Sequence, residues 1–416
     1  MPNPGWSALM AVIALAGAPA LAQEPREETH RSELVAWPGP WSFLLPHAAI
    51  ILVSDQELEA LSDPDAVLNL TLGREPRMES LRQVCLRAQA RGAHTLTLAF
   101  DHFFRQYRPG QDAPRRLMPD MDEYIRRVAA IGQFAQRYGL GLELSLLSPL
   151  EIGKAYAART GESGVWMHYR EGLRDPVTGA FSVQLWRHKR WANNKGPVDV
   201  EDAGVRAFAF RESRIPGTPY RVVDPAAMVE VTADVRVERF GNVEARAGDF
   251  RAERIRVYSN GPARQPGLDR VLVIQQYRTP EMDYFSPKAL PFLTELIDRY
   301  AAAGVPLHAL YSDEMHIQQD WAYFSHHDAG QFALRYVSPG LEQEFARRYG
   351  AQYRDFARYL IYFTYGQEDF ANDLSARQGV MHVFGASPEE IRRTALFRAR
   401  YYRLLQDGVV DLFVAA

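Results

Sequence analysis

Two adjacent carboxylates, Asp313 and Glu314, follow the apolar segment 306–311 (PLHALY), whose composition is typical of a buried strand. Carboxylates at such a position are costly unless they are paired or hydrogen-bonded, and this is where acid pKa values are tuned for proton transfer. Hydrolysis of a glycosidic bond needs one carboxyl group to protonate the leaving oxygen and a second as nucleophile or as base for water. The alternative is that the pair caps the N-terminus of a helix. We therefore predict that Glu314 and Asp313 are catalytic and that Tyr311, His316 and Trp321 bind the substrate.

Polar and charged residues follow other apolar segments in the same way. The loops after the parallel strands of a barrel lie together at one end and form the active site. We predict that these residues bind the substrate, although an Asp there can also cap a helix and an Arg can be tied to a neighbouring acid such as Asp283. They are Asp101 and His102 after segment 93–100, Glu151 after segment 140–147, and Arg278 and Glu281 after segment 270–277.

The segments that position these residues alternate between helical and strand patterns. Helical spacing of apolar residues runs through 78–91, 121–138 and 286–303, and each stretch is followed by a glycine typical of a helix end. Nearly all-apolar strands between helices favour a parallel sheet covered by helices, either a doubly wound sheet or a (β/α)8 barrel. No glycine-rich phosphate turn follows any of the strands, which argues against a nucleotide-binding doubly wound sheet. We therefore predict an α/β fold of the (β/α)8 barrel type.

The stretch 161–265 has a different pattern. It lacks helical periodicity and contains short alternating segments separated by Gly, Pro, Asn and Asp, which predicts an inserted antiparallel β subdomain. Its tryptophans either form the core of this subdomain, as favoured for Trp186, or provide a platform for sugar rings, as is equally plausible for Trp191. The predicted domains are 1–22 (signal peptide), 23–77 (leader or cap with a possible strand at 48–53), 78–160 (first β/α units), 161–265 (insertion) and 266–416 (further β/α units and a long helical region).

The order of these segments resembles the clan A glycoside hydrolases, especially the family 42-type β-galactosidase barrels. Counting 95–100, 142–147, 271–277 and 307–311 as strands one to four puts Glu314 where that family carries its acid/base after the fourth strand. The resemblance runs from Gly92 to the end without the insertion and implies a glycosidase. It departs from the family at Asp313, where the family usually has Asn, and a neighbouring carboxylate would raise the pKa of Glu314 by repulsion.

Composition excludes several classes of function. The 48 Lys and Arg against 51 Asp and Glu give a net charge of −3, so no sequence-wide basic field invites nucleic acid. A single cysteine, Cys85, excludes a disulfide scaffold and a thiolate-rich metal site. His316 and Asp320 have the i, i+4 spacing of metal ligands, but further ligands are not evident, so we expect neither metal nor cofactor.

The two ends of the chain carry separate predictions. An apolar run from Ala8 to Ala22 ends in Ala-Leu-Ala, the pattern of a cleaved export signal, which predicts a periplasmic or extracellular protein without a membrane span after cleavage. Without the signal, the leader and the insertion, the 416 residues leave about four β/α units. The second carboxylate of a clan A barrel follows strand seven. We therefore expect a barrel incomplete at its C-terminus, the front part of a longer enzyme.

Two other functions stay open. The chain could be a non-catalytic carbohydrate-binding barrel, or a polysaccharide lyase that uses Tyr, His and Arg. The sequence leaves open the sugar, the linkage, the choice between retention and inversion, and the oligomeric state. The predicted partner is in each case an oligo- or polysaccharide.

Overall fold

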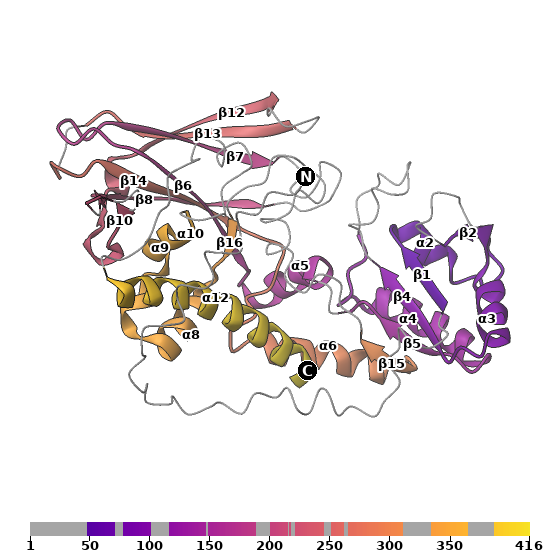
Figure 1. The fold of residues 1–416 in the computed structure, drawn as a ribbon. Helices are drawn as coiled ribbons and strands as arrows, with labels where there is room; N and C mark the ends of the chain where they lie inside the picture. Colours follow the sequence, from indigo (N-terminus) through magenta and orange to yellow (C-terminus); the bar gives the residue numbers. More distant parts are fainter. Residues whose placement is uncertain are drawn as a thin grey trace, which may run out of the picture. The chain divides into compact units, whose positions relative to one another are not determined.

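The computed structural model divides the chain into two compact units, 1–45 and 46–416, and all described elements belong to the second (Figure 1). The predicted signal peptide and Trp191 lie outside the described residues. Among the helices of the described part, none combines the length and apolar composition needed to cross a membrane. The described residues are 48–70, 78–100, 116–146, 149–188, 200–214, 216–217, 221–244, 251–261, 265–310, 334–364 and 387–416.

A four-stranded parallel sheet holds the first part of the unit together. Its strands are β1 (Ala48–Leu52), β4 (Thr95–Phe100), β5 (Gly141–Leu144) and β15 (Leu307–Leu310), and their spatial order β1-β4-β5-β15 is also their order along the chain. The predicted strand at 48–53 is thus confirmed, and it occupies one edge of this sheet. The structure is therefore a mixed α/β protein, with a parallel sheet as expected.

Helices α3 (Leu81–Ala90) and α4 (Asp122–Gln136) connect these strands, and local chemistry sets their ends. Ser80 accepts a hydrogen bond from the backbone of Gln83, whose side chain reaches back to the backbone of Ser80, so that two otherwise unsatisfied N–H groups are paired. Gly92 follows α3 at φ 72° and Gly139 follows α4 at φ 76°, a conformation that only glycine adopts without strain. The helices predicted at 78–91 and 121–138 are confirmed by these elements.

Strand β14 (Arg270–Arg278) corrects the predicted strand count. We expected its residues 271–277 to form the third parallel strand, but β14 pairs antiparallel with β6 (Val165–Leu173) on one side and with β8 (Glu201–Phe210) on the other. Its run of apolar residues reflects burial of both faces rather than a place in the parallel sheet. The parallel sheet still contains four strands, because β1 enters the count as β14 leaves it.

Antiparallel pairing fills the region where we expected an inserted β subdomain. A five-stranded sheet has the order β11-β8-β14-β6-β16, and a three-stranded sheet has the order β12-β13-β7. The two sheets approach closely where Gly172 faces Val183, since a Cβ atom on Gly172 would lie 2.5 Å from the Val183 side chain. The remaining strands are β7 (Phe181–His188), β11 (Val229–Glu230), β12 (Arg236–Glu244), β13 (Arg251–Ser259), β16 (Leu334–Tyr336) and the short pairs β2 (Leu68–Asn69) with β3 (Met78–Glu79) and β9 (Ser213–Arg214) with β10 (Arg221–Val222).

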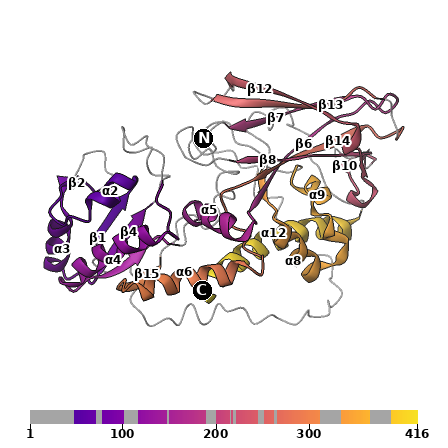
Figure 2. The same ribbon diagram turned by 180° about the vertical axis from the view of Figure 1, so that it is seen from behind.

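The last part of the chain is helical. Helix α12 (Pro388–Ala415) begins at the dipeptide Ser387-Pro388, a sequence typical of a helix start, and the Ser387 hydroxyl accepts a hydrogen bond from the backbone of Glu390. Helices α8 and α12 lie side by side (Figure 2). Aromatic rings of both helices and of the segment between them pack around Phe397. The segment 351–364 consists of short helical pieces. The remaining helices are α2 (Asp55–Ala60), α5 (Pro149–Thr160), α6 (Ala289–Ala302), α8 (Pro339–Tyr349), α9 (Phe356–Tyr359) and α10 (Ile361–Thr364), with 3-10 turns at Pro225–Ala227, Thr232–Asp234 and Ala351–Arg354.

Candidate functional site

Most of the predicted site lies outside the described residues. This holds for the catalytic pair Asp313 and Glu314, and Glu151 lies on α5 with its side chain outside the description. In the parallel sheet, β4 ends at Phe100 and β15 ends at Leu310, so the chain leaves both strands at the same edge just before these residues. The predictions for the strand ends therefore stay predictions, and the residues outside the description are Asp101, His102, Tyr311, Asp313, Glu314, His316 and Trp321.

One face of the parallel sheet carries polar side chains. Thr97 on β4 donates a hydrogen bond to the carboxylate of Glu143 on β5 at 2.5 Å, and Thr95 lies 3.2 Å from a ring nitrogen of His308 on β15. Leu96 and the other alternate residues of β4 are buried on the opposite face. In a (β/α)8 barrel the face away from the helices is the interior, so these polar residues stand where a barrel places its inner layers.

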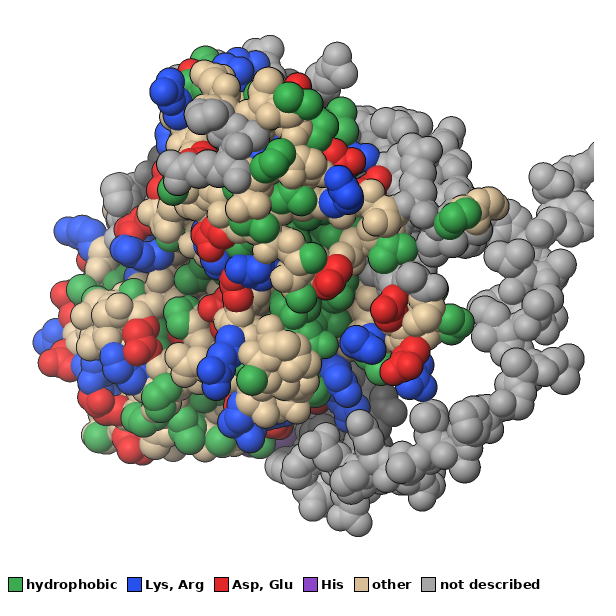
Figure 3. Space-filling view, turned by 90° about the vertical axis from the view of Figure 1, so that its left-hand side faces the viewer, with side chains coloured by type: hydrophobic (Ala, Val, Ile, Leu, Met, Phe, Trp, Pro, Cys, Tyr) green, Lys and Arg blue, Asp and Glu red, His purple; other side chains and the backbone are tan. Residues whose placement is uncertain are grey.

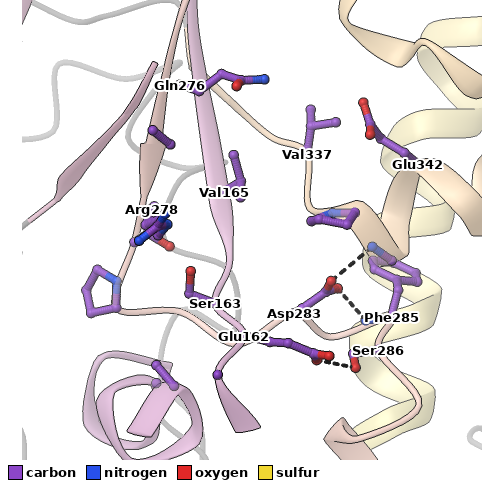
Figure 4. Close-up of a pocket in the computed structure, with 18 of the residues that line it drawn as sticks. Glu162, Ser163, Val165, Gln276, Arg278, Asp283, Phe285, Ser286, Val337 and Glu342 are labelled. Carbon is purple, nitrogen blue, oxygen red and sulfur yellow. Dashed lines mark hydrogen bonds between the residues drawn. The ribbon is translucent and has the colours of Figure 1, made fainter.

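A large pocket lies where α5, β6, β14 and the N-terminus of α8 meet (Figure 4). Its volume is about 1020 Å³. Close backbone contacts fix its wall: Gly164 donates a hydrogen bond to the carbonyl of Glu281 at 2.7 Å, and a Cβ atom on Gly153 would overlap the carbonyl oxygen of Pro280. The pocket is thus a built feature of the antiparallel region and not a gap between loosely packed segments.

Asp283 anchors the helix at one side of the pocket. Its carboxylate accepts hydrogen bonds from the Ser338 hydroxyl at 2.5 Å, the Gly340 backbone at 2.9 Å and the Phe285 backbone at 3.2 Å. Burial raises the pKa of Asp283 above its ordinary value, although these three donors oppose the rise. The carboxylate therefore stabilises the start of α8 by pairing the Gly340 N–H group that the helix leaves open and by holding the Ser338 hydroxyl at the N-cap.

Glu162 is held as a charged carboxylate. It accepts hydrogen bonds from the Ser286 hydroxyl at 2.5 Å and from the Tyr156 hydroxyl at 2.8 Å, and it forms an ion pair with Lys288 at 2.9 Å. The hydrogen bond from Ser286 is the main reason why the pKa of Glu162 lies below its ordinary value. Its negative charge is therefore neutralised within the protein.

Glu342 on α8 differs from both of these acids. Among the described residues its carboxyl group forms neither a hydrogen bond nor an ion pair, and it lies across the pocket from the strand that carries Val165 (Figure 4). Burial, as the main cause, and nearby Asp355 together raise the pKa of Glu342 to about 7, while Arg206 opposes the rise. A carboxyl group with this pKa is present in both protonation states near neutral pH, so it can donate or accept a hydrogen bond.

Two residues predicted from the sequence lie at or beside this pocket. Arg278 lines it with a side chain that is 63% exposed, and its ion pair is a long one of 3.8 Å with Glu201. The partner of Arg278 is therefore Glu201, and not Glu281 or Asp283 as in the alternative reading. Glu281 is fully buried and accepts hydrogen bonds from the Trp166 indole at 2.5 Å and the Tyr284 hydroxyl at 3.5 Å, which makes it a residue of the core beside the pocket.

Sequence reasoning missed Glu162 and Glu342. Glu342 follows Ser338-Pro339, a helix start in which an acid in the first turn is ordinary, so its pattern carries no sign of a pocket. Glu162 lies between a helix end and a strand, where acids are common. Among the described residues there is no group of three or more His, Cys, Asp or Glu side chains that could hold a metal ion.

Charged residues of both signs are interspersed over the face of the described part shown in Figure 3. The fold and the pocket define a mixed α/β protein with a large pocket lined by polar and apolar side chains. No protein-family model matches the sequence, and a search for similar curated proteins found no match. Among solved structures, the rhamnosidase from Novosphingobium sp. PP1Y is similar to 90% of this chain at 12% identity and a TM-score of 0.32. The chain spans 44% of the length of that rhamnosidase, and a TM-score this low does not establish a common fold.

Proposed function

We propose that this chain is an exported glycoside hydrolase that cleaves a glycosidic bond in an oligo- or polysaccharide, with Glu314 as acid/base. The observation that supports the proposal is the strand order β1-β4-β5-β15, because the order of these four strands in space is also their order along the chain. Doubly wound sheets reverse their order at a switch point, whereas barrel strands follow one another in sequence. The order therefore favours the first four strands of a barrel, although a closed barrel is not part of the described structure.

The corrected strand count leaves the proposed position of Glu314 unchanged. In the described structure β15 is the fourth parallel strand along the chain, and in the sequence Glu314 follows it after three intervening residues. The count made from the sequence also placed this strand fourth, but it did so by including β14 and leaving out β1. The proposal thus depends on β15 alone and not on the misplaced strand.

The proposed chemistry needs a proton at the leaving oxygen and a second carboxylate. Glu314 would supply the proton, and the charge of Asp313 beside it would favour the protonated form of Glu314 by raising its pKa. We assign the second carboxylate to Asp313. Asp101 and His102, which follow β4 at the same edge of the sheet, would contact the sugar.

Replacing Glu314 by Gln tests the proposal. We expect the turnover of aryl glycosides with poor leaving groups to fall by about 10²–10⁴-fold, because these need protonation, while activated nitrophenyl glycosides lose less. The matched control is Glu344→Gln, which makes the same change on an acid of α8 that pairs with Arg347 and Arg348. Full activity of Glu314→Gln on both kinds of substrate would contradict the assignment. Products that absorb in the near ultraviolet would indicate a lyase, and binding without cleavage would indicate a carbohydrate-binding protein.

A further inference from the structure

The pocket between α5, β6, β14 and α8 has a charge distribution that limits its ligand. Two of its acids are already paired: Glu162 with Lys288, and Asp283 with the start of α8. Basic side chains are fewer than acids in the lining, which disfavours phosphorylated and other strongly anionic ligands. The charged residues of the lining are Lys154 and Arg278 against Glu162, Glu201, Asp283 and Glu342.

The polar side chains of the pocket that can still hydrogen-bond a ligand are suited to its hydroxyl groups. Among the described residues, the side-chain amides of Gln276 and Gln343 make no hydrogen bond with the protein, and the Glu342 carboxyl makes none either. Arg278 adds a planar guanidinium whose ion pair with Glu201 is long and exposed. Amide, carboxyl and guanidinium groups each present paired donor or acceptor sites, and such sites match neighbouring hydroxyls of one ring.

Apolar side chains line both sides of the pocket. Val165 and Met167 come from β6, and Val337 precedes α8, with Met167 and Val337 almost fully buried. Figure 4 shows Val165 and Gln276 on the strands facing Val337 and Glu342 across the space. A sugar ring has C–H groups that fit the apolar side chains and hydroxyls that fit the polar ones, whereas a purely apolar ligand would leave the polar side chains without hydrogen bonds.

We infer that this pocket binds a neutral oligosaccharide, with Gln276, Arg278 and Glu342 as hydrogen-bonding partners of its hydroxyls. A volume of about 1020 Å³ lies at the upper end of the range of ligand pockets, so more than one sugar ring has room. The inference shares the substrate class of the proposed function but uses none of its catalytic residues. The site binds saccharide whether or not Glu314 cleaves it.

Saturation-transfer NMR on the full chain carrying Glu314→Gln tests the inference directly. The probes are maltotriose, cellotriose, xylotriose and β-1,4-galactotriose at millimolar concentration, with trigalacturonic acid and inorganic phosphate as charged comparators. We expect at least one neutral trisaccharide to receive saturation and the charged probes to receive none. Absence of a signal from all four neutral trisaccharides would overturn the inference, as would stronger binding of the charged probes.

Variants then place the binding in the pocket. Ala203→Trp adds bulk to the lining and should abolish the signal, and Arg278→Met should weaken the affinity by about tenfold, as expected for a lost hydrogen bond to a charged group. Gln276→Leu provides a second lining variant if Ala203→Trp fails to fold, as judged by circular dichroism. Arg211→Met and Glu344→Gln, which lie outside the lining, are the matched controls. Binding that survives the lining variants would refute the site, while hydrolysis by Glu314→Gln would refute only the proposed function.

Discussion

Strand β14 of the antiparallel sheet and strand β4 of the parallel sheet differ in how their two faces are covered. In β14 the successive residues from Val271 to Ile274 are all fully buried, whereas β4 alternates between half-exposed threonines and buried leucines over residues 95–98. Parallel strands are usually buried on both faces and antiparallel strands on one, so the two strands reverse the usual relation. A continuous apolar run therefore reports that both faces are covered, and it does not report the direction of the neighbouring strands.

Alanine substitutions at neighbouring positions give the largest expected effect within this comparison. On β14 we expect Leu272→Ala to lower the free energy of unfolding by about 2–5 kcal/mol and Val273→Ala to lower it by a smaller but clear amount, because both side chains are buried. On β4 we expect Leu96→Ala to lower the free energy of unfolding by the same amount as Leu272→Ala. We expect Thr95→Ala to change it by no more than about 0.5 kcal/mol. Urea unfolding of the four variants measures the pattern. Equal costs for Leu96 and Thr95 would break the comparison.

Substitution of Gly153 tests how tightly α5 packs against the segment after β14. A methyl group on this glycine would overlap the carbonyl oxygen of Pro280, so Gly153→Ala should destabilise the protein by about 3 kcal/mol and distort the pocket that it lines. Gly241→Ala is the control, because a Cβ atom at Gly241 meets nothing within 4 Å. Thermal unfolding of both variants measures the difference. If Gly153→Ala and Gly241→Ala had the same melting temperature, α5 would be able to shift away from Pro280 at little cost.

The carboxyl group of Glu342, beside the antiparallel sheet, should make the stability of the folded protein depend on pH. Because the pKa of Glu342 is about 7 in the folded protein against an ordinary 4.5, the folded state binds the extra proton between these values. Stability should therefore fall as pH rises from about 5 to 8, by about 1–2 kcal/mol after allowance for solvent screening. Glu342→Gln should remove this part of the fall, with a gain at pH 8 and little change at pH 5. Urea unfolding at both pH values checks it, and an unchanged pH dependence would contradict the raised pKa.

The smallest expected effect concerns a helix that connects two strands of the parallel sheet. Ser80→Ala removes one half of the reciprocal cap of α3, and we expect a loss of about 1 kcal/mol in the free energy of unfolding. Ser182→Ala, on an exposed position of β7 that accepts a hydrogen bond from Arg256, is the comparison on the antiparallel side and should cost less. If Ser182→Ala lowered the free energy of unfolding more than Ser80→Ala, this prediction would be wrong.

The parts of the fold that could be predicted from the sequence are those set by local chemistry. Helix α12 begins at Ser387-Pro388 because a serine hydroxyl and a proline at the first position favour a helix start within a few residues. Helix α5 begins at Pro149 after the same dipeptide, but we predicted only a loop there, so a usable signal was missed. The alternating pattern of the insertion likewise indicated antiparallel strands.

The parts that could not be predicted depend on residues far apart in the chain. The neighbours of β14 come from β6 and β8, and no feature of its own nine residues distinguishes them from parallel partners. The raised pKa of Glu342 depends on burial and on Asp355 and Arg206, which the sequence does not place beside it. Of the candidate site, the sequence therefore indicated Arg278 but not the acid across the pocket.

The pairing of β5 with β15 has a consequence for how the chain folds. Leu144 and Leu307 belong to neighbouring strands, yet all of β6 to β14 is synthesised between them. Bringing two strand ends together across a flexible segment of that length carries a loop-closure entropy cost, which falls once the intervening segment has folded. We therefore expect the antiparallel sheets to form first and to act as a rigid bridge that brings β15 to β5, so that closure of the parallel sheet is the late step of folding.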